Sequence, residues 1–509
     1  MPKSRTSKNE FFTFILVNLL VIHSVFANLK APAYFSDGMV LQQKSKLPLL
    51  GWDSPGNSIS INCSWTNKVI STKVDEHGKW QINIDTPKAG GPYQILIKSP
   101  KDSINIKDVL VGEVWLCSGQ SNMVFRFSNC KSYPEDKAKM NLPEIRYLEV
   151  KRNISNMPQD DIPGSSWISV NSENAYDLSA VALYFAQKLQ LDLNIPIGII
   201  EASWGGTAID TWTPIKALKS DAKLSINLDR WETWKNDFKK DSIGYQAQLV
   251  ALENGEISTN PEMPTSVYIN NRPHREPSSL FNGMIAPLTK FKIKGVIWYQ
   301  GETNRTWSKE YQYHLTKFIE VWRQEWGCNL PFCLIQLAPY KGNAEGVSEI
   351  MEAQFKVSNT VENVGLVVTM DVGDMNDIHP KDKKPVGYRL ANWALSEIYN
   401  YTTINYSGPL FKGSEKKEDS IRLFFEHASS GLLPQDTLNG FEYIEFNEDG
   451  TQKAPKHLEV SIDGQDLVIS SEKFNFPVII RYGWGLEMEK ANLYNKEGLP
   501  ASPFRTLIK

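Results

Sequence analysis

Four short polar segments each follow an apolar run, and their residue types suit the hydrolysis of an ester. A serine, paired glycines, amides beside a carboxylate, and a histidine among carboxylates occur in that order. A hydroxyl nucleophile, a histidine base and closely approaching backbone N–H groups are the parts of acyl transfer through a serine. We name these segments the serine loop (118–122), the glycine loop (203–207), the amide loop (300–304) and the histidine loop (371–380).

Ser121, in the serine loop, is the candidate nucleophile. The loop ends the apolar run 109–117 in the way that a buried strand ends in a tight turn, and α/β hydrolases hold their nucleophile at such a strand end. Taken alone, the pattern equally fits a strand-to-helix turn in which Ser121 caps the helix. The chain has no G-x-S-x-G, P-loop or H-E-x-x-H motif, so a hydrolase here needs a histidine far from the serine in sequence.

His379, in the histidine loop, is the candidate base. Among the seven histidines of the chain, it is the one that several carboxylates flank at the end of a predicted strand. A general base needs such a carboxylate to fix its tautomer and to stabilise the imidazolium. The alternative is an aspartate that caps the following helix, with the histidine as a bystander.

The elements that must position these loops alternate between strands and helices. Apolar strands separated by amphipathic helices form a parallel sheet that is covered on both faces. Ligands bind beyond the carboxyl ends of such strands, so we expect the four loops to meet at one edge of the sheet. The sequence predicts strands at 109–117, 197–202, 295–299, 332–337 and 364–370 and helices at 178–191, 309–326 and 384–400.

The flanking regions contain short β-prone runs separated by turn signals, which is typical of β-sandwiches. A chain of 509 residues also exceeds the usual size of one core. We therefore predict an N-terminal β-sandwich module (28–107), an α/β domain (108–400) and a C-terminal β module (401–509). Residues 216–275 interrupt the alternation with polar, helix-like sequence followed by a stretch rich in Pro, Asn and Arg, and we predict that they form an insertion near the site.

Residues 1–27 have the composition of a cleavable signal peptide. Basic residues precede an apolar run, and small residues lead to Ala27. This predicts a secreted or periplasmic protein, with an uncleaved anchor as the alternative, and no later segment is apolar enough to span a bilayer. The net charge of −3 gives no reason to expect nucleic acid or an anionic membrane as a partner.

The five cysteines are irregularly spaced and include no C-x-x-C pair, which argues against a zinc site. In an oxidising compartment, Cys117 could pair with Cys130, or Cys328 with Cys333. The alternative is that most of them are buried free thiols.

The sequences of the four loops resemble the sialate O-acetylesterase family of the SGNH/GDSL hydrolases. GQSNM, SWGGT, WYQGETN and DIHP occur in that order, and the similarity extends over most of the chain. The resemblance implies a flavodoxin-like hydrolase domain and a carbohydrate esterase that removes O-acetyl groups from sialic acid without a metal or cofactor. An acetylxylan or other glycan O-acetylesterase is the alternative. A carbohydrate-binding protein with a decayed site is a second one.

The resemblance assigns Ser121 as the nucleophile and His379 as the base. The superfamily pattern for the supporting carboxylate is Asp-x-x-His, but the residue three positions before His379 is Asn376. We expect Asp377 to take this role. Asp374 or a backbone carbonyl are the alternatives.

The resemblance also implies an oxyanion hole and a substrate pocket. The hole would use the backbone N–H of Ser121, that of Gly205 or Gly206, and a side-chain amide of the amide loop, Gln300 as first choice and Asn304 as second. The carboxylate of sialic acid calls for a nearby cation. Arg126 and Arg305 flank two of the loops and are the candidates, although either one alone fits an ordinary surface arginine. The predicted substrate-binding residues are Gln120, Asn122, Arg126, Glu302 and Arg305.

Overall fold

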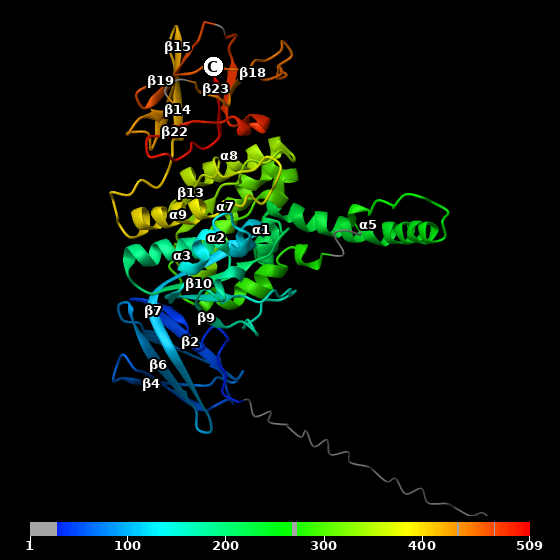
Figure 1. The fold of residues 1–509 in the computed structure, drawn as a ribbon. Coiled ribbons are helices and arrows are strands. Elements are labelled where there is room, and N and C mark those ends of the chain that lie inside the picture. The colour runs from blue at the N-terminus through cyan, green and yellow to red at the C-terminus, as the bar shows by residue number, and fades with distance from the viewer. Residues whose placement is uncertain (1–27, 267–271, 435–436, 473) are drawn as a thin grey trace, which may run out of the picture.

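The computed structural model describes residues 28–266, 272–434, 437–472 and 474–509, so the predicted signal peptide lies outside the described residues. A β-rich N-terminal region, an α/β region and a β-rich C-terminal region follow one another along the molecule (Figure 1). Within the described ranges, no helix has the length and apolar character needed to cross a bilayer.

Strand β7 (Ser103–Gly119) joins two of these regions. Its first part pairs with β6 (Gly90–Lys98) of the N-terminal region, and its last part pairs with β10 (Ile197–Ser203) and β11 (Gly295–Tyr299) of the α/β region. Every position from Val109 to the end of β7 is buried. The domain boundary that the sequence predicts after residue 107 therefore falls inside a continuous strand.

The centre of the α/β region is a parallel sheet in the order β10-β7-β11-β12-β13, with β12 at Phe332–Ile335 and β13 at Val364–Val367. This is the strand order of flavodoxin-like folds, as the resemblance implies. The chain places β10 on one side of β7 and β11 on the other. The loops that follow β10 and β11 therefore lie on opposite sides of the end of β7. Open α/β sheets bind ligands in the crevice between loops that separate in this way.

Two strands extend this sheet beyond β10, and the sequence does not predict them. They are β8 (Leu142–Glu149), parallel to β10, and β9 (Trp167–Val170), antiparallel to β8. Only half of the positions in each of these outer strands are buried. Their sequences therefore lack the continuous apolar run that marks the central strands.

Helices cover both faces of the sheet. On one face, α3 (Ala180–Leu193) packs against α9 (Lys384–Trp393), and on the other α7 (Ser308–Trp326) packs against α8 (Ala344–Thr360). The sequence predicts α3, α7 and α9 but not α8.

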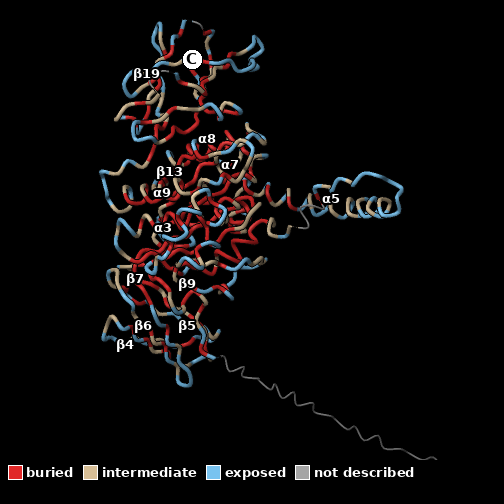
Figure 2. The backbone as a smooth tube through the Cα atoms, viewed as in Figure 1, coloured by how far each residue is buried: buried red, intermediate tan, exposed pale blue. Residues whose placement is uncertain are grey.

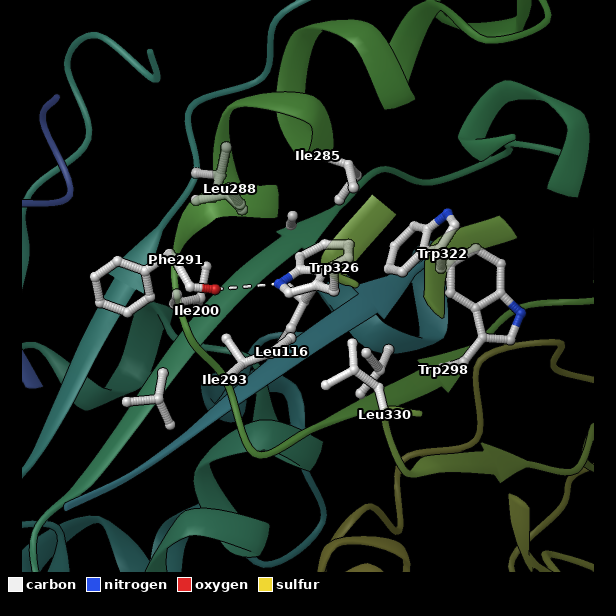
Figure 3. Packing of buried hydrophobic residues seen from close by; sticks show 14 of the residues in the cluster. Leu116, Ile200, Ile285, Leu288, Phe291, Ile293, Trp298, Trp322, Trp326 and Leu330 are labelled. Carbon is white, nitrogen blue, oxygen red and sulfur yellow. Dashed lines mark hydrogen bonds between the residues drawn. The ribbon is translucent and has the colours of Figure 1, made fainter. Parts of the chain in front are cut away.

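Adjacent residues of β7 point to opposite faces of the sheet and pack against different helices. Trp115 contacts the rings of Phe185 and Trp393 on the α3 and α9 side. Leu116 points to the opposite face, which holds a layer of tryptophans (Figure 3). In this layer, the indole of Trp326 donates a hydrogen bond to the carbonyl of Phe291 at 3.1 Å, so its one polar atom is satisfied inside the core.

The two flanking regions are antiparallel for the most part. In the N-terminal region, strands β1, β3, β4 and β6 join the sheet of β7, and β2 and β5 form a separate ribbon. The C-terminal region contains two four-stranded sheets around their own apolar core, β14-β15-β20-β19 and β18-β17-β21-β23, and a short pair, β16 and β22. The bounds are β1 Val40–Gln42, β2 Lys46–Trp52, β3 Ser58–Cys63, β4 Val69–Lys73, β5 Lys79–Asp85, β14 Leu410–Lys416, β15 Ser420–Glu426, β16 Leu432–Leu433, β17 Phe441–Ile444, β18 Lys456–His457, β19 Ser461–Asp463, β20 Asp466–Ser470, β21 Val478–Tyr482, β22 Tyr494–Asn495 and β23 Phe504–Ile508.

The predicted insertion forms an arm that projects from the α/β region (Figure 1). It begins with α4 (Ile215–Ser220) and continues as α5 (Ala222–Glu253), a helix of 32 residues. The buried residues of α5 lie in its first turns, and most of its remaining length is exposed (Figure 2). Only the root of the arm therefore packs against the sheet domain.

All five cysteines lie among the described residues, and all are free thiols. Four of them are buried and Cys328 is exposed. Burial raises the pKa of Cys117 and of Cys333 well above the usual thiol value. Neither of the two pairings that the sequence allows is present.

Candidate active site

Ser121 and His379 meet at the carboxyl edge of the sheet. The Oγ atom of Ser121 lies 2.8 Å from Nε2 of His379, although the two residues are 258 positions apart in the chain. Ser121 is the first residue of the short helix α1 (Ser121–Val124), whose N-cap is Gln120, and no side chain caps this helix. The Ser121 hydroxyl therefore faces the imidazole rather than the helix backbone, and His379 is not a bystander.

Asp377 is the carboxylate nearest to the far side of the imidazole. Its Oδ1 atom lies 3.9 Å from Nδ1 of His379 and accepts a hydrogen bond from the backbone N–H of His379 at 2.9 Å. The alternative carboxylate, Asp374, accepts the backbone N–H of Asn376 at 2.8 Å instead. Asp377 thus fixes the turn that carries His379 and lies at ion-pair distance from its ring.

The glycine loop passes directly beside Ser121. A Cβ atom placed on Gly205 would lie 3.3 Å from Cβ of Ser121. The backbone of Gly206 has φ +73°, which a residue with a side chain rarely adopts. Trp204, which precedes the glycines, donates its backbone N–H to the carbonyl of Gly119 at 3.1 Å, so the glycine loop is tied to the end of β7.

The side-chain amides of Gln300 and Asn304, the two candidates in the amide loop, make different hydrogen bonds. Gln300 is fully buried, and its Nε2 donates to the carbonyl of Thr207 at 3.1 Å and to Oδ1 of Asn304 at 2.8 Å. Both hydrogens of that nitrogen are therefore used. Asn304 accepts at Oδ1 from Gln300 and from the backbone N–H of Ile209 at 3.1 Å, which fixes the orientation of its amide. Since Nδ2 of Asn304 has no partner among the described residues, the order of preference reverses, and Asn304 becomes the first choice for the oxyanion hole.

Three predicted substrate-binding residues hold the loops to one another instead of facing open space. They are Gln120, Asn122 and Glu302. Gln120 is buried, and its Oε1 accepts the backbone N–H groups of Gly301 and Thr303 at 3.3 and 3.4 Å. Asn122 is also buried and donates from Nδ2 to Glu302 at 2.5 Å and to the carbonyl of Ile378 at 3.0 Å.

Lys383 belongs to this network, although it is not among the predicted site residues. The side chain is fully buried, and its Nζ donates to Oδ1 of Asn122 at 2.6 Å. The ammonium also lies 5.0 Å from the ring centre of Phe125 and 5.2 Å from that of Tyr299, which are favourable cation–π distances. Burial lowers the pKa of Lys383 to about 8, and the carboxylate of Glu302 opposes this effect. Lys383 is one of three lysines in the sequence KDKK (381–384), and no sequence pattern separates it from a surface lysine.

The two predicted cations for a substrate carboxylate differ in the charges that surround them. Arg126 forms ion pairs with Glu149 at 2.9 Å, Asp177 at 3.4 Å and Glu201 at 3.9 Å. Glu149 and Asp177, together with Glu201, whose pKa burial raises to about 7, leave no excess positive charge at this arginine. Arg305 lies over the ring of Tyr340 with its guanidinium carbon 5.4 Å from the ring centre. Arg126 is therefore a poor candidate for binding an anionic group of the substrate. Nη1 of Arg305 is buried and has no hydrogen-bond partner among the described residues, so Arg305 stays a candidate.

Replacing Asn304 by aspartate tests the assignment of the side-chain donor. The Asn304→Asp change keeps an oxygen to accept from Gln300 and Ile209 but removes the Nδ2 donor. We expect kcat for acetate release to fall about 10²–10³-fold, because that is the usual cost of losing one oxyanion-hole donor. Urea unfolding should remain close to that of the wild type. A variant that keeps the wild-type kcat would contradict the assignment.

The acid limb of the pH profile tests the charges around His379. Burial and the Lys383 ammonium lower the pKa of His379 below 6.5, and Asp377 acts in the opposite direction. The neutral imidazole is the active base, so kcat/KM should fall only as the pH drops through a value below 6.5. Lys383→Met should move this midpoint to higher pH, and Asp377→Asn should move it to lower pH. Shifts in the same direction for both variants would refute this account.

Comparisons with known proteins agree with this geometry. A family model described as carbohydrate esterase, sialic acid-specific acetylesterase, matches residues 269–396, which include the amide and histidine loops. Sialate O-acetylesterases from Mus musculus and Rattus norvegicus are 29% and 28% identical to the chain; the alignments cover 97% of both chains for the mouse protein and 94% of both for the rat protein. A carbohydrate acetylesterase from Xanthomonas citri is 30% identical, with a TM-score of 0.78 over 94% of this chain and 99% of that chain. The chain therefore belongs to the sialate O-acetylesterase family of carbohydrate esterases and is a carboxylic ester hydrolase.

Proposed function

We propose that the protein removes O-acetyl groups from sialic acid through an acetyl-serine intermediate. The observation that carries this proposal is the 2.8 Å contact between Ser121 Oγ and His379 Nε2 beside the glycine loop. The sialate O-acetylesterases of mouse and rat, which align along nearly the whole chain, support the choice of substrate.

The reaction follows from the positions of these groups. His379 takes the proton of Ser121 as Oγ attacks the acetyl carbonyl carbon. The backbone N–H groups of Ser121 and Gly205 and the Nδ2 of Asn304 stabilise the negative charge that develops on the carbonyl oxygen. The intermediate collapses, and His379 gives the proton to the departing sugar hydroxyl. A water molecule, deprotonated by His379, then releases acetate from Ser121.

A broader glycan O-acetylesterase is the second candidate. It is favoured by the Xanthomonas citri relative, which is named a carbohydrate acetylesterase without reference to sialic acid. Acetate release from O-acetylated sialic acid and from acetylated xylan, measured at equal ester concentration, separates the two functions. A higher kcat/KM on the xylan would overturn the sialic acid proposal and leave the acyl-serine mechanism intact.

Removal of the nucleophile tests the mechanism. In Ser121→Ala, we expect acetate release from O-acetylated sialic acid to fall by at least about 10³-fold, because the remaining groups cannot form the acyl-enzyme. The thermal unfolding midpoint should stay near that of the wild type, since the hydroxyl packs against no core residue. Wild-type turnover in this variant would instead support a carbohydrate-binding protein whose esterase site has decayed.

We also propose that the protein is secreted or periplasmic after removal of residues 1–27. The composition of this segment, with basic residues before an apolar run, supports the proposal. Mass spectrometry of the protein isolated from its compartment should find an N-terminus at residue 28. A full-length chain retained in the membrane fraction would argue for an uncleaved anchor instead.

A further inference from the structure

A cavity of about 350 Å³ lies where the arm meets the amide loop, and this volume is within the range of small-molecule sites. Helix α5 contributes Trp234 to its wall, and the amide loop and the turn that follows it contribute Thr303 and Trp307. The described residues that line the cavity include neither Ser121 nor His379. A ligand of this cavity is therefore a group other than the reacting ester.

The cavity borders the segments that hold Asn304, the proposed oxyanion donor. Thr303, in its wall, directly precedes Asn304 in the amide loop. In the segment after the glycine loop, the wall includes the residues on either side of Ile209, which are Ala208 and Asp210. The backbone N–H of Ile209 donates to Oδ1 of Asn304 at 3.1 Å. Because one residue spans about 3.8 Å of backbone, the wall lies near enough to this donor for a sugar linked to the reacting one to reach it.

Asp210 presents a carboxyl group to the cavity with little to bind it. The residue is only 8% exposed, and burial raises its pKa to about 7, an effect that the charge of Arg230 opposes. Apart from its own backbone N–H, no described residue donates a hydrogen bond to this carboxyl. A buried polar group without partners is destabilising, whereas a hydroxyl group of a ligand would donate to it. Asp210 is therefore suited to binding a ligand rich in hydroxyl groups.

Two tryptophans give the cavity an aromatic wall. Trp234 and Trp307 are both half-buried, and their ring centres lie 5.7 Å apart with the planes inclined at 46°. The guanidinium carbon of Arg230 lies 4.9 Å from the ring centre of Trp307, and Glu310 accepts from this guanidinium at 2.6 and 2.8 Å. The charge of Arg230 is thus compensated. Aromatic rings beside a few polar groups are typical of small-molecule sites, and they suit a sugar, which has an apolar carbon face and a rim of hydroxyl groups.

We propose that this cavity binds a second sugar of the glycan, the one linked to the acetylated sialic acid, while the ester lies at Ser121. Trp234 packs against the carbon face of the second sugar, and Asp210 and the hydroxyl groups of Thr303 and Thr306 bind its hydroxyl groups. The enzyme thereby favours acetylated sialic acid within a glycan over the single sugar. This inference rests on the proposed function and extends it from the reacting sugar to the glycan that carries it.

The test compares one acetylated sugar with and without its neighbour. Acetate release is measured from O-acetylated sialic acid linked to lactose, from the methyl glycoside of the same acetylated sugar, and from 4-nitrophenyl acetate. For the wild type, we expect kcat/KM to be about 10-fold higher for the lactose conjugate than for the methyl glycoside, because contacts away from the reacting group also stabilise the transition state. Trp234→Ala should remove most of this difference and change kcat/KM for the other two substrates by less than about twofold.

Asp210→Asn should act in the same direction from a separate segment of the chain, because the amide keeps the shape of the carboxyl but has one acceptor oxygen instead of two. Trp65→Ala is the matched control. Trp65 is also half-buried, and it packs edge-on against Tyr93 in the N-terminal region, with the ring centres 5.4 Å apart. Its replacement should leave kcat/KM unchanged for all three substrates.

Three outcomes separate the second-sugar site from the proposed function. Equal kcat/KM of the wild type for the lactose conjugate and the methyl glycoside, or an equal loss on both in Trp234→Ala, would rule out the site while the proposed function stands. If Trp234→Ala does not fold, Asp210→Asn decides by the same comparison. If the wild type releases acetate from 4-nitrophenyl acetate but from neither sialic acid compound, the proposed substrate itself is wrong, and the inference falls with it.

Discussion

The arrangement of the site depends on one buried side-chain amide, that of Asn122. Its nitrogen donates to Glu302 of the amide loop and to the carbonyl of Ile378 in the histidine loop, and its oxygen accepts from Lys383. A buried amide with all its partners present fixes their relative positions, because leaving any of them unpaired would cost about 1–3 kcal/mol. Asn122 directly follows the nucleophile, so the same contacts determine where Ser121 lies relative to His379.

The parallel strands explain why the sequence could place Ser121 and His379 at the same edge of the sheet. The apolar runs before the serine and histidine loops predicted parallel strands, and the carboxyl ends of such strands meet at one edge. Ser121 and His379 therefore lie at the same edge of the sheet. Two strands, β11 and β12, lie between β7 and β13, and the histidine loop brings His379 to Ser121 although the two residues are 258 positions apart. The less apolar outer strands β8 and β9 and the helix α8 escaped prediction, but none of them contributes to this meeting point.

The roles of the other polar residues were not accessible to sequence reasoning. Gln300 and Asn304 are both amides of one loop. They are distinguished because Nε2 of Gln300 donates to Thr207 of the glycine loop and to Asn304 itself, which leaves Nδ2 of Asn304 as the available donor. The role of Arg126 is likewise undecided until folding places three carboxylates around it. In each case, the neighbours that decide the role come from segments distant in the chain. Residue type alone thus identified the polar groups but not the direction in which each one faces.

The continuity of β7 has a consequence for the way in which the molecule holds together. Seventeen residues of strand correspond to a length of about 55 Å, which runs from the N-terminal region to the residue before Gln120 without a linker. Core residues of both regions also belong to one apolar cluster, in which Leu47 and Ile59 join Leu116 and Trp298. Loss of the N-terminal sheet would strip the nucleophile strand of half its hydrogen-bonded neighbours. We therefore expect the two regions to unfold as a single cooperative unit, so that the thermal stability of the strand end that holds the catalytic serine depends on the N-terminal sheet.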